Sequence, residues 1–229
     1  MDAARLRAFG PGPGSGYDPG AAAPRTAARV EQGRIRHFQA HLERLGISAA
    51  AIGQPTLWLA GQTEAIADWV AGTSIAPLET LRLRLHGDQL WALLEPLVET
   101  PSPYRLKLAP HPLGTATAHP LAPHKGLMGT WNAEPLTHAT AAGADDALLF
   151  WPDGTLVETA IASIALEVGG SLWVPPLEGR VASLAERIDL PGWAASRDIH
   201  IQAFQTTDLG RGRLWCFNAV RGVWLGTLL

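Results

Sequence analysis

Alternating hydrophobic and polar positions recur along the chain and predict β-strands. The clearest case is LRLRLH at 81–86, which places three leucines on one face and Arg82 and Arg84 on the other. The same rule predicts further strands at 89–95 and 104–109 and a hairpin around Glu31-Gln32-Gly33.

Helical periodicity separates these strands. Residues 40–48 (AHLERLGIS) predict a short helix with leucines on one face and Gly46 as its stop. Residues 63–71 predict a second helix with Thr63 as N-cap. The first half of the chain is therefore expected to be α+β with a largely antiparallel sheet.

The second half repeats this mixture after a proline-rich break. Residues 109–124 hold four prolines without periodicity, which is typical of an interdomain linker. Helices are predicted at 131–142, interrupted at Pro135, and at 180–188. Short strands are predicted at 147–151, 155–158, 163–168, 171–174, 199–204, 213–220 and 222–226.

These elements predict an α+β protein with two domains. Residues 25–108 would form a smaller domain, 109–124 the linker and 125–229 a larger domain. Residues 1–24, rich in Gly, Pro and Ala, are expected to form a flexible arm.

Composition narrows the classes of function. With 47% hydrophobic and 17% charged residues the chain should be globular, and a net charge of −3 offers no basic field for nucleic acid. Cys216 is the only cysteine, and His111, His119 and His124 are irregularly spaced, so no metal site is predicted. No apolar run approaches a membrane span, which favours a cytoplasmic protein.

The use of basic residues draws attention to one lysine. Of the 18 basic residues only Lys107 and Lys125 are lysines, so the chain uses arginine at nearly every position where a basic residue is present. A lysine amine can lose its proton when buried and then form a Schiff base with a carbonyl, which arginine cannot do. The alternative that Lys125 is simply exposed beside a proline-rich loop stays open at this point.

Six segments of the chain stand in the order typical of one enzyme family. The segments are ARVEQGRIRHFQAHLERL, LRLRLHG, LGTATAHPLAPHKG, GADDALLFWPDGTLVETAIASIAL, LWVPPLEGRVASLAER and FNAVRG. Together they resemble the class IV aminotransferases, the fold-type IV pyridoxal-phosphate (PLP) enzymes, which include branched-chain and D-amino-acid aminotransferases and aminodeoxychorismate lyase. The resemblance implies a two-domain α+β fold like that of D-amino-acid aminotransferase, PLP as cofactor, a small-molecule substrate and a homodimer.

The resemblance also implies a role for individual residues. Lys125 would hold the aldehyde of PLP, Glu158 would face its pyridine nitrogen, and Arg44 would bind its phosphate. Backbone amides at the start of a helix would complete the phosphate site. These amides would belong to Ser183, Leu184 and Ala185, with Asn218 and Ala219 at a second phosphate-contacting turn.

Within the family, the segments before Leu45 and before Lys125 look closest to aminodeoxychorismate lyase, a folate-pathway enzyme that releases 4-aminobenzoate and pyruvate. An aminotransferase remains the alternative, because Arg82 or Arg84 could hold a substrate carboxylate. The chain departs from the family pattern at Ala185, where a threonine is expected. A degenerate member without catalytic activity is therefore a third hypothesis.

Overall fold

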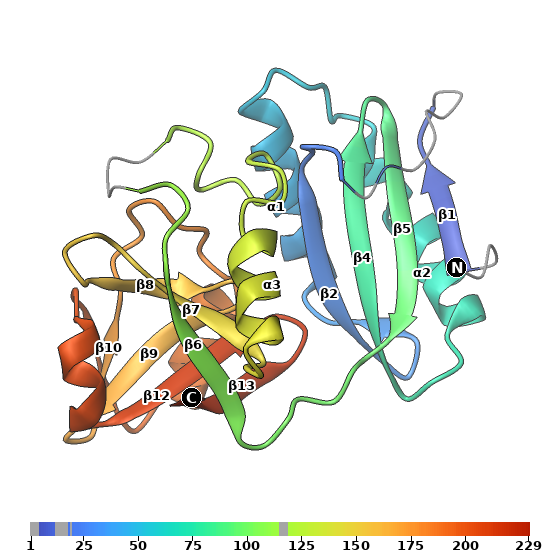
Figure 1. The fold of residues 1–229 in the computed structure, drawn as a ribbon. Helices are drawn as coiled ribbons and strands as arrows, with labels where there is room; N and C mark the ends of the chain where they lie inside the picture. Colours follow the sequence, from blue (N-terminus) through green and yellow to red (C-terminus); the bar gives the residue numbers. More distant parts are fainter. Residues whose placement is uncertain (1–4, 12–17, 19, 115–118) are drawn as a thin grey trace. The chain divides into compact units, whose positions relative to one another are not determined.

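A computed structural model describes residues 5–11, 18, 20–114 and 119–229 (Figure 1). The chain forms two compact units. The first comprises the described residues of Met1–Val98 together with His124–Gly129, and the second comprises those of Glu99–Pro123 and Thr130–Leu229. Both combine helices with strands, so the predicted fold class is confirmed.

The first unit is built on a five-stranded sheet in the order β1-β5-β4-β2-β3, with every neighbouring pair antiparallel. The predicted hairpin is confirmed, since Gln32 and Gly33 both take positive φ between two paired strands. The strands are β1 (Leu6–Phe9), β2 (Arg25–Glu31), β3 (Arg34–Ile35), β4 (Leu78–His86) and β5 (Gln89–Pro96).

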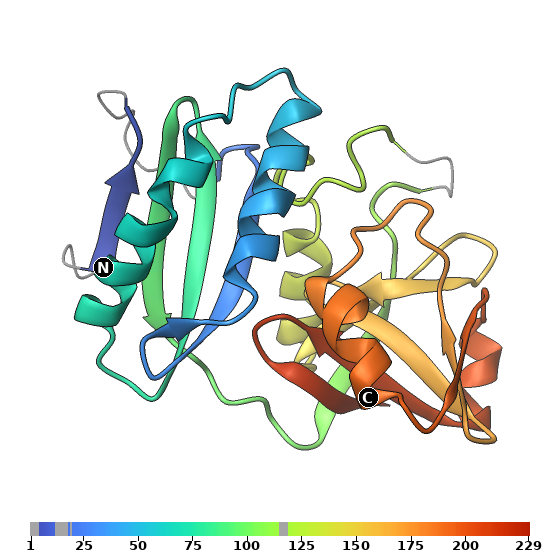
Figure 2. The same cartoon turned by 180° about the vertical axis from the view of Figure 1, so that it is seen from behind.

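Two helices, α1 (Phe38–Ala50) and α2 (Thr63–Thr73), cover one face of this sheet, as Figures 1 and 2 show from opposite sides. A short 3-10 turn, η2 (Leu59–Gln62), leads into α2. Helix residues such as Leu45 and Ile66 join the alternating leucines of β4 in one buried cluster. Burial of this apolar surface is the main stabilising term of the unit.

Two predicted helix ends in this unit are wrong. Helix α1 continues through Gly46 to Ala50, because packing of its apolar face against the sheet outweighs the low helix propensity of one glycine. Thr63 is the first residue of α2 and not its N-cap. Its hydroxyl donates to the carbonyl of Ala60 in the preceding turn.

The predicted flexible arm is also corrected in part. Leu6–Phe9 forms β1, which pairs with β5, and the Phe9 side chain is buried in the core of the unit. The four residues of β1 include only one polar residue, Arg7, and do not alternate, so no pattern reveals a strand next to the glycine-rich run. Part of that run, 12–17, lies outside the described residues.

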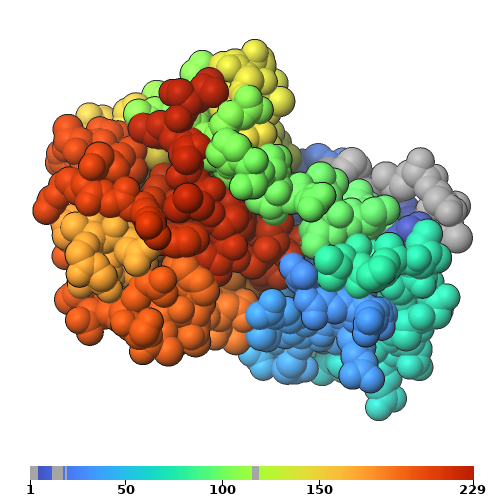
Figure 3. Space-filling model, turned by 90° about the horizontal axis from the view of Figure 1, so that it is seen from below, coloured from blue at the N-terminus to red at the C-terminus, as the bar shows by residue number. Residues whose placement is uncertain are grey.

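The second unit contains an eight-stranded mixed sheet in the order β11-β10-β9-β12-β13-β6-β7-β8. Strand β6 runs parallel to both of its neighbours, and Figure 3 shows its green residues beside the red C-terminal strand. The strands are β6 (Tyr104–Pro110), β7 (Asp146–Phe150), β8 (Leu156–Thr159), β9 (Ser163–Val168), β10 (Ser171–Val174), β11 (Asp198–Ile201), β12 (Arg213–Asn218) and β13 (Gly222–Leu228).

Its helices are shorter than the sequence suggests. Helix α3 (Ala133–Ala141) is not interrupted at Pro135, which lies in the first turn, where a missing N–H breaks no bond. The predicted helix over 180–188 begins only at η3 (Ala185–Asp189), a π-helical turn followed by α4 (Leu190–Trp193). A 3-10 turn, η4 (Thr206–Arg211), precedes β12.

The units divide the chain at other residues than the predicted domain boundaries. Strand β6, expected in the first domain, hydrogen-bonds within the sheet of the second unit. Residues 124–129, expected to open the larger domain, group with the first unit. Backbone hydrogen bonds between residues far apart in sequence accompany both groupings: strand pairing holds β6 in the second sheet, and the amides of Ala23 and Arg25 bond to the carbonyls of Gly126 and Lys125. Local patterns do not encode these contacts.

Candidate functional site

Lys125 is held by its backbone in the first unit. The carbonyl of Lys125 accepts a hydrogen bond from the amide of Arg25 (3.0 Å), and that of Gly126 accepts one from Ala23 (3.1 Å). Gly126 takes φ +95°, and a Cβ there would lie 2.2 Å from the Ala23 carbonyl oxygen. Only glycine therefore permits the close approach that fixes the residue following the lysine.

Both cations that were predicted to bind the cofactor in this unit act on one buried histidine. His41 lies on α1, is 1% exposed, and its Nδ1 lies 2.7 Å from the hydroxyl oxygen of Thr26. Burial, and then the positive charges of Arg44 and Lys125, lower the pKa of His41 to about 3. The His41 ring is therefore neutral at physiological pH, and Arg44 and Lys125 are both close enough for their charges to reach it.

The two arginines of β4 have different surroundings. Arg82 is 58% exposed at its side chain and forms an ion pair with Glu95 on the neighbouring strand. Arg84 is buried, and its Nη1 donates to the carbonyls of Asp18 (3.0 Å) and Ala21 (2.7 Å). Arg84 thus anchors the segment that leads into β2.

In the second unit, Glu158 lies on β8 and is 8% exposed. The turn that follows it is tightly bonded: the Thr159 hydroxyl accepts from the amide of Ala162 (2.9 Å), and the Thr159 amide donates back to the Ala162 carbonyl (2.8 Å). The side-chain amide of Asn218 donates to the carbonyl of Ile161 in this turn (3.2 Å). Glu158 therefore lies at the end of a strand, directly before a turn that several hydrogen bonds hold in place.

Asn218 and Ala219 form the turn between β12 and β13. The side-chain oxygen of Asn218 accepts from the amides of Val220 (3.0 Å) and Arg221 (2.8 Å). Asn218 is the last residue of β12, pairs with Gly222 of β13, and shapes the turn through its side chain. The structure brings this turn to the residues that follow Glu158.

The predicted phosphate-binding amides lie at 183–185, where the chain enters η3. The Ala185 amide donates to the hydroxyl of Ser183 (3.2 Å), and Leu184 and Ala185 are buried. Ala185 packs in one cluster with Phe217, the residue before Asn218. The two segments that were expected to contact a phosphate are thus neighbours within the second unit.

Asp146 is a residue that the motif contained but to which no role was assigned. It is fully buried at the start of β7, where Oδ1 accepts from the Ala147 amide (2.7 Å) and Oδ2 lies 3.4 Å from the hydroxyl oxygen of Tyr104. Thr159 and Ala160 lie near this carboxyl group and act against the rise of its pKa, and the amide of Ala160 donates to the carbonyl of Ala147 (3.0 Å). The carboxyl group of Asp146 is therefore close to Thr159 and Ala160, the first residues of the turn after Glu158.

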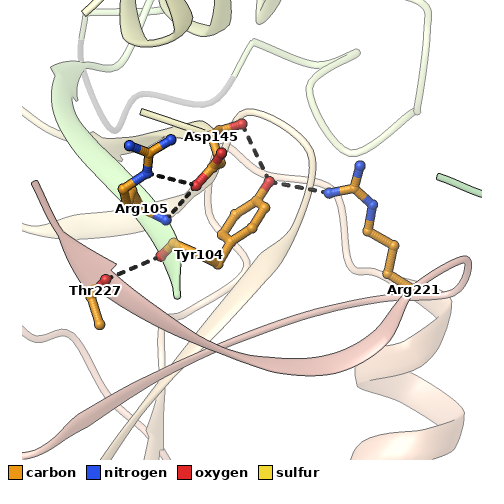
Figure 4. Close-up of polar contacts among 5 residues, drawn as sticks. All are labelled: Tyr104, Arg105, Asp145, Arg221 and Thr227. Atoms are coloured by element: carbon orange, nitrogen blue, oxygen red, sulfur yellow. Dashed lines mark hydrogen bonds and ion pairs between the residues drawn. The ribbon is translucent and has the colours of Figure 1, made fainter. Parts of the chain in front are cut away.

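The surroundings of Tyr104 extend this network (Figure 4). The Tyr104 hydroxyl accepts from Nη1 of Arg221 (3.3 Å) and lies 3.5 Å from the Asp145 carbonyl oxygen. Burial raises the pKa of the Tyr104 hydroxyl, which keeps it protonated and able to donate. Arg221 follows the Asn218 turn, so hydrogen bonds connect that turn to Asp146 as well.

Asp146→Asn is expected to change how stability depends on pH. Burial raises the Asp146 pKa from 3.8 to about 6, so the folded state holds a proton that the unfolded chain has already released. The free energy of unfolding should therefore fall by roughly 2–3 kcal/mol between about pH 4 and pH 6 in the wild type, relative to the variant. Urea unfolding at several pH values measures this difference.

The neighbouring carboxylate provides the control for this experiment. Hydrogen bonds from Arg105 lower the pKa of Asp145, so Asp145→Asn should produce no such slope above about pH 5. A difference between wild type and Asp146→Asn that stays constant with pH would contradict the burial of an acid with a raised pKa.

The described residues contain no group of three or more His, Cys, Asp or Glu residues that could hold a metal ion. His111 packs against Trp151 with the two rings tilted by 45° (4.0 Å between ring centres), and burial lowers the pKa of His111 to about 4. Among the same residues, no helix combines the length and apolar composition needed to cross a bilayer.

Comparison with known proteins places the chain in a family. The family described as amino-transferase class IV matches residues 26–226, whereas no curated protein matches the chain. Among solved structures, a hypothetical aminotransferase from Mycobacterium tuberculosis aligns with a TM-score of 0.80 and 20% identity over 90% of this chain and 81% of that chain. The same description recurs for a PLP-bound form, with a TM-score of 0.73 and 22% identity over the same shares of the two chains.

Two further structures carry the name "Putative 4-amino-4-deoxychorismate lyase". One aligns with a TM-score of 0.74 and 24% identity over 90% of this chain and 84% of that chain. The other, from Legionella pneumophila, aligns with a TM-score of 0.77 and 19% identity over 91% and 83%. At these identities the likeness establishes the fold.

Proposed function

Since the chain belongs to the class IV amino-transferase family, we propose that it is a PLP-dependent lyase that releases 4-aminobenzoate and pyruvate from 4-amino-4-deoxychorismate. Enzymes of this family use PLP. The observation that carries the proposal is the fixed position of Lys125, whose backbone is bonded to Arg25 and whose charge, with that of Arg44, reaches the buried His41 ring.

The donor groups fit PLP. Lys125 supplies an amine for the aldehyde, Arg44 a guanidinium for the phosphate, and Glu158 a buried carboxylate for the pyridine nitrogen. Ser163, five residues after Glu158, has a buried hydroxyl oxygen without a hydrogen-bond partner among the described residues. A buried polar group of this kind is costly unless a ligand or water satisfies it.

Lys125 has a defined task in the proposed reaction. When bound, PLP withdraws electrons from the carbon that carries the substrate's amino group. The amine of Lys125 takes the proton from this carbon, and the carbon–oxygen bond at the neighbouring carbon then breaks. The enolpyruvyl group leaves and is protonated to pyruvate, while loss of the proton and the leaving group makes the ring aromatic.

Two observations support the lyase over an aminotransferase. The segments before Leu45 and Lys125 look closest to the lyase branch. The arginines that an aminotransferase would use for a substrate carboxylate are engaged elsewhere, Arg82 with Glu95 and Arg84 with backbone carbonyls.

Incubation with PLP and 4-amino-4-deoxychorismate tests the proposal. We expect equal amounts of 4-aminobenzoate, followed by fluorescence, and pyruvate, followed with lactate dehydrogenase. Glutamate formation from 2-oxoglutarate and a branched-chain or D-amino acid, without 4-aminobenzoate, would instead identify an aminotransferase. Absence of any visible PLP absorbance band would identify a non-catalytic family member.

Arg44→Ala is expected to weaken PLP binding about tenfold or more, because a charge-assisted hydrogen bond to the phosphate is lost. Titration of the protein with PLP, followed by visible absorbance, measures this affinity. Arg34→Ala, which removes an exposed arginine of β3 in the same unit, is the matched control. Unaltered PLP affinity in the Arg44 variant would remove Arg44 from the phosphate site.

The predicted homodimer and cytoplasmic location rest on the family resemblance and on the sequence. Light scattering of the purified protein measures the first. A mass of about twice 24.4 kDa is the expected result.

A further inference from the structure

We propose that Arg180, through its ion pair with Glu186, is a positioning residue that fixes the segment 175–186 for the phosphate of the cofactor. This inference rests on the proposed function, which assigns the amides of 183–185 to the phosphate. It concerns two side chains to which neither the motif nor the family assigns a task here.

The contacts of Arg180 are exceptionally complete. Its side chain is 0% exposed, and Glu186 is 10% exposed. Nη1 and Nη2 each donate to one carboxylate oxygen of Glu186 at 2.6 Å, which is the bidentate geometry of strong arginine–carboxylate pairs. Nε donates to the carbonyl of Pro176 (2.9 Å) and Nη2 also to that of Pro175 (2.6 Å).

These bonds join the two ends of one irregular segment. Residues 175–183 form neither helix nor strand, and the segment runs from the end of β10 to the start of η3. Arg180 stands in its middle and bonds to its first two residues and to Glu186, just beyond the proposed phosphate amides. Gly179 allows the Trp151 ring to lie close to the same turn, since a Cβ there would be 2.8 Å from a ring atom of Trp151.

Stability alone gives a weak reason for such a pair. Burying two charges costs solvation free energy that their attraction barely offsets, and apolar side chains of similar volume often stabilise a protein as well or better. A buried pair does, however, define one geometry for the groups that it bonds. The geometry that Arg180 defines is the path of the chain into residues 183–185.

Charge gives Arg180 a second task. Glu186 directly follows the amides assigned to the phosphate, and an unpaired carboxylate there would repel a phosphate dianion. The guanidinium of Arg180 neutralises this carboxylate without presenting itself as the phosphate ligand. Loss of Arg180 should therefore impair binding of a phosphorylated cofactor specifically.

Pyridoxal has the ring and aldehyde of PLP but no phosphate. Comparing the binding of the two compounds therefore separates an effect of Arg180 on the phosphate site from a general effect on the fold. Titration of the PLP-free protein with each compound, followed by visible absorbance, gives two dissociation constants. In Arg180→Met we expect PLP affinity to fall about tenfold or more while pyridoxal affinity changes less than about twofold. The double variant Arg180→Met/Glu186→Gln should regain part of the loss, because the unpaired carboxylate is gone.

A second ion pair of the same unit provides the control. Arg197 bonds to Glu167 (3.1 Å) and to the carbonyl of Trp193 (3.3 Å) and stacks on the Trp193 ring, so Arg197→Met should leave the preference for PLP over pyridoxal unchanged. If Arg180→Met does not fold, Arg180→Lys keeps the charge but cannot form the bidentate pair, and the preference should fall severalfold.

The outcomes distinguish failure of the proposed function from failure of the role proposed for Arg180. A wild-type protein that binds neither compound overturns the proposed function and this inference with it. A wild type that prefers PLP, with the same preference in the folded Arg180 variants, overturns only the inference. Equal losses for PLP and pyridoxal would likewise reduce Arg180 to a structural residue.

Discussion

Lys125→Ala is expected to lower turnover by about 10⁴-fold or more, since the proposed mechanism gives this one amine two tasks, as the covalent anchor of PLP and as the base. The visible absorbance band of the protein with PLP should disappear, together with the adduct that borohydride reduction would otherwise leave on Lys125. Peptide mapping after reduction measures the second effect directly.

Lys107→Ala is the control for this substitution, because Lys107 is the only other lysine and is exposed on β6. It should leave absorbance, adduct and turnover unchanged. The two variants share the change in charge and in side-chain length, so a difference between them reports the position of the lysine. Wild-type turnover in Lys125→Ala, or an adduct mapped to Lys107, would refute the assignment.

Strand and helix locations in this protein could largely be predicted, because period-2 and helical patterns follow from which face of each element is buried. The leucines of β4 are an example, since all three predicted inward positions are buried. Element ends were less predictable. Gly46 inside α1 and Pro135 inside α3 show that packing and position within a helix decide whether a breaking residue ends it.

Pairing between distant segments could not be predicted from local patterns. Strand β6 pairs with β13, more than a hundred residues later, and this pairing moves it from the predicted first domain to the second unit. The same holds for Lys125, whose neighbours Ala23 and Arg25 lie about a hundred residues earlier in the chain.

The supporting residues of the candidate site were the largest omission. Asp146 and Arg180 both lie inside motifs that the resemblance used, but a motif gives no burial, and an isolated Asp or Arg in sequence reads as a surface residue. In the structure Asp146 is 0% exposed and Arg180 is 1% exposed, and this burial shows that each side chain needs hydrogen-bond partners inside the protein.

Glu158→Gln is expected to keep PLP bound but to slow removal of the substrate proton by about 10²–10³-fold, the usual cost of removing one preorganised electrostatic partner. A carboxylate stabilises a protonated pyridine nitrogen, whereas a neutral amide of the same shape cannot. Burial of Glu158 makes the difference larger, because the interaction is weakly screened. Single-turnover exchange of the substrate proton for deuterium measures this step.

Glu167→Gln is the matched control, because Glu167 lies on β9 of the same sheet and bonds instead to Arg197 and Trp215. Its exchange rate should equal that of the wild type, although its stability should be lower. The nitrogen chemical shift of ¹⁵N-labelled PLP adds a readout independent of rate, and only Glu158→Gln should move it toward the neutral pyridine value. An unchanged shift and an unchanged exchange rate in Glu158→Gln would make this carboxylate a structural group, held in place by the turn at 159–162 for the fold alone.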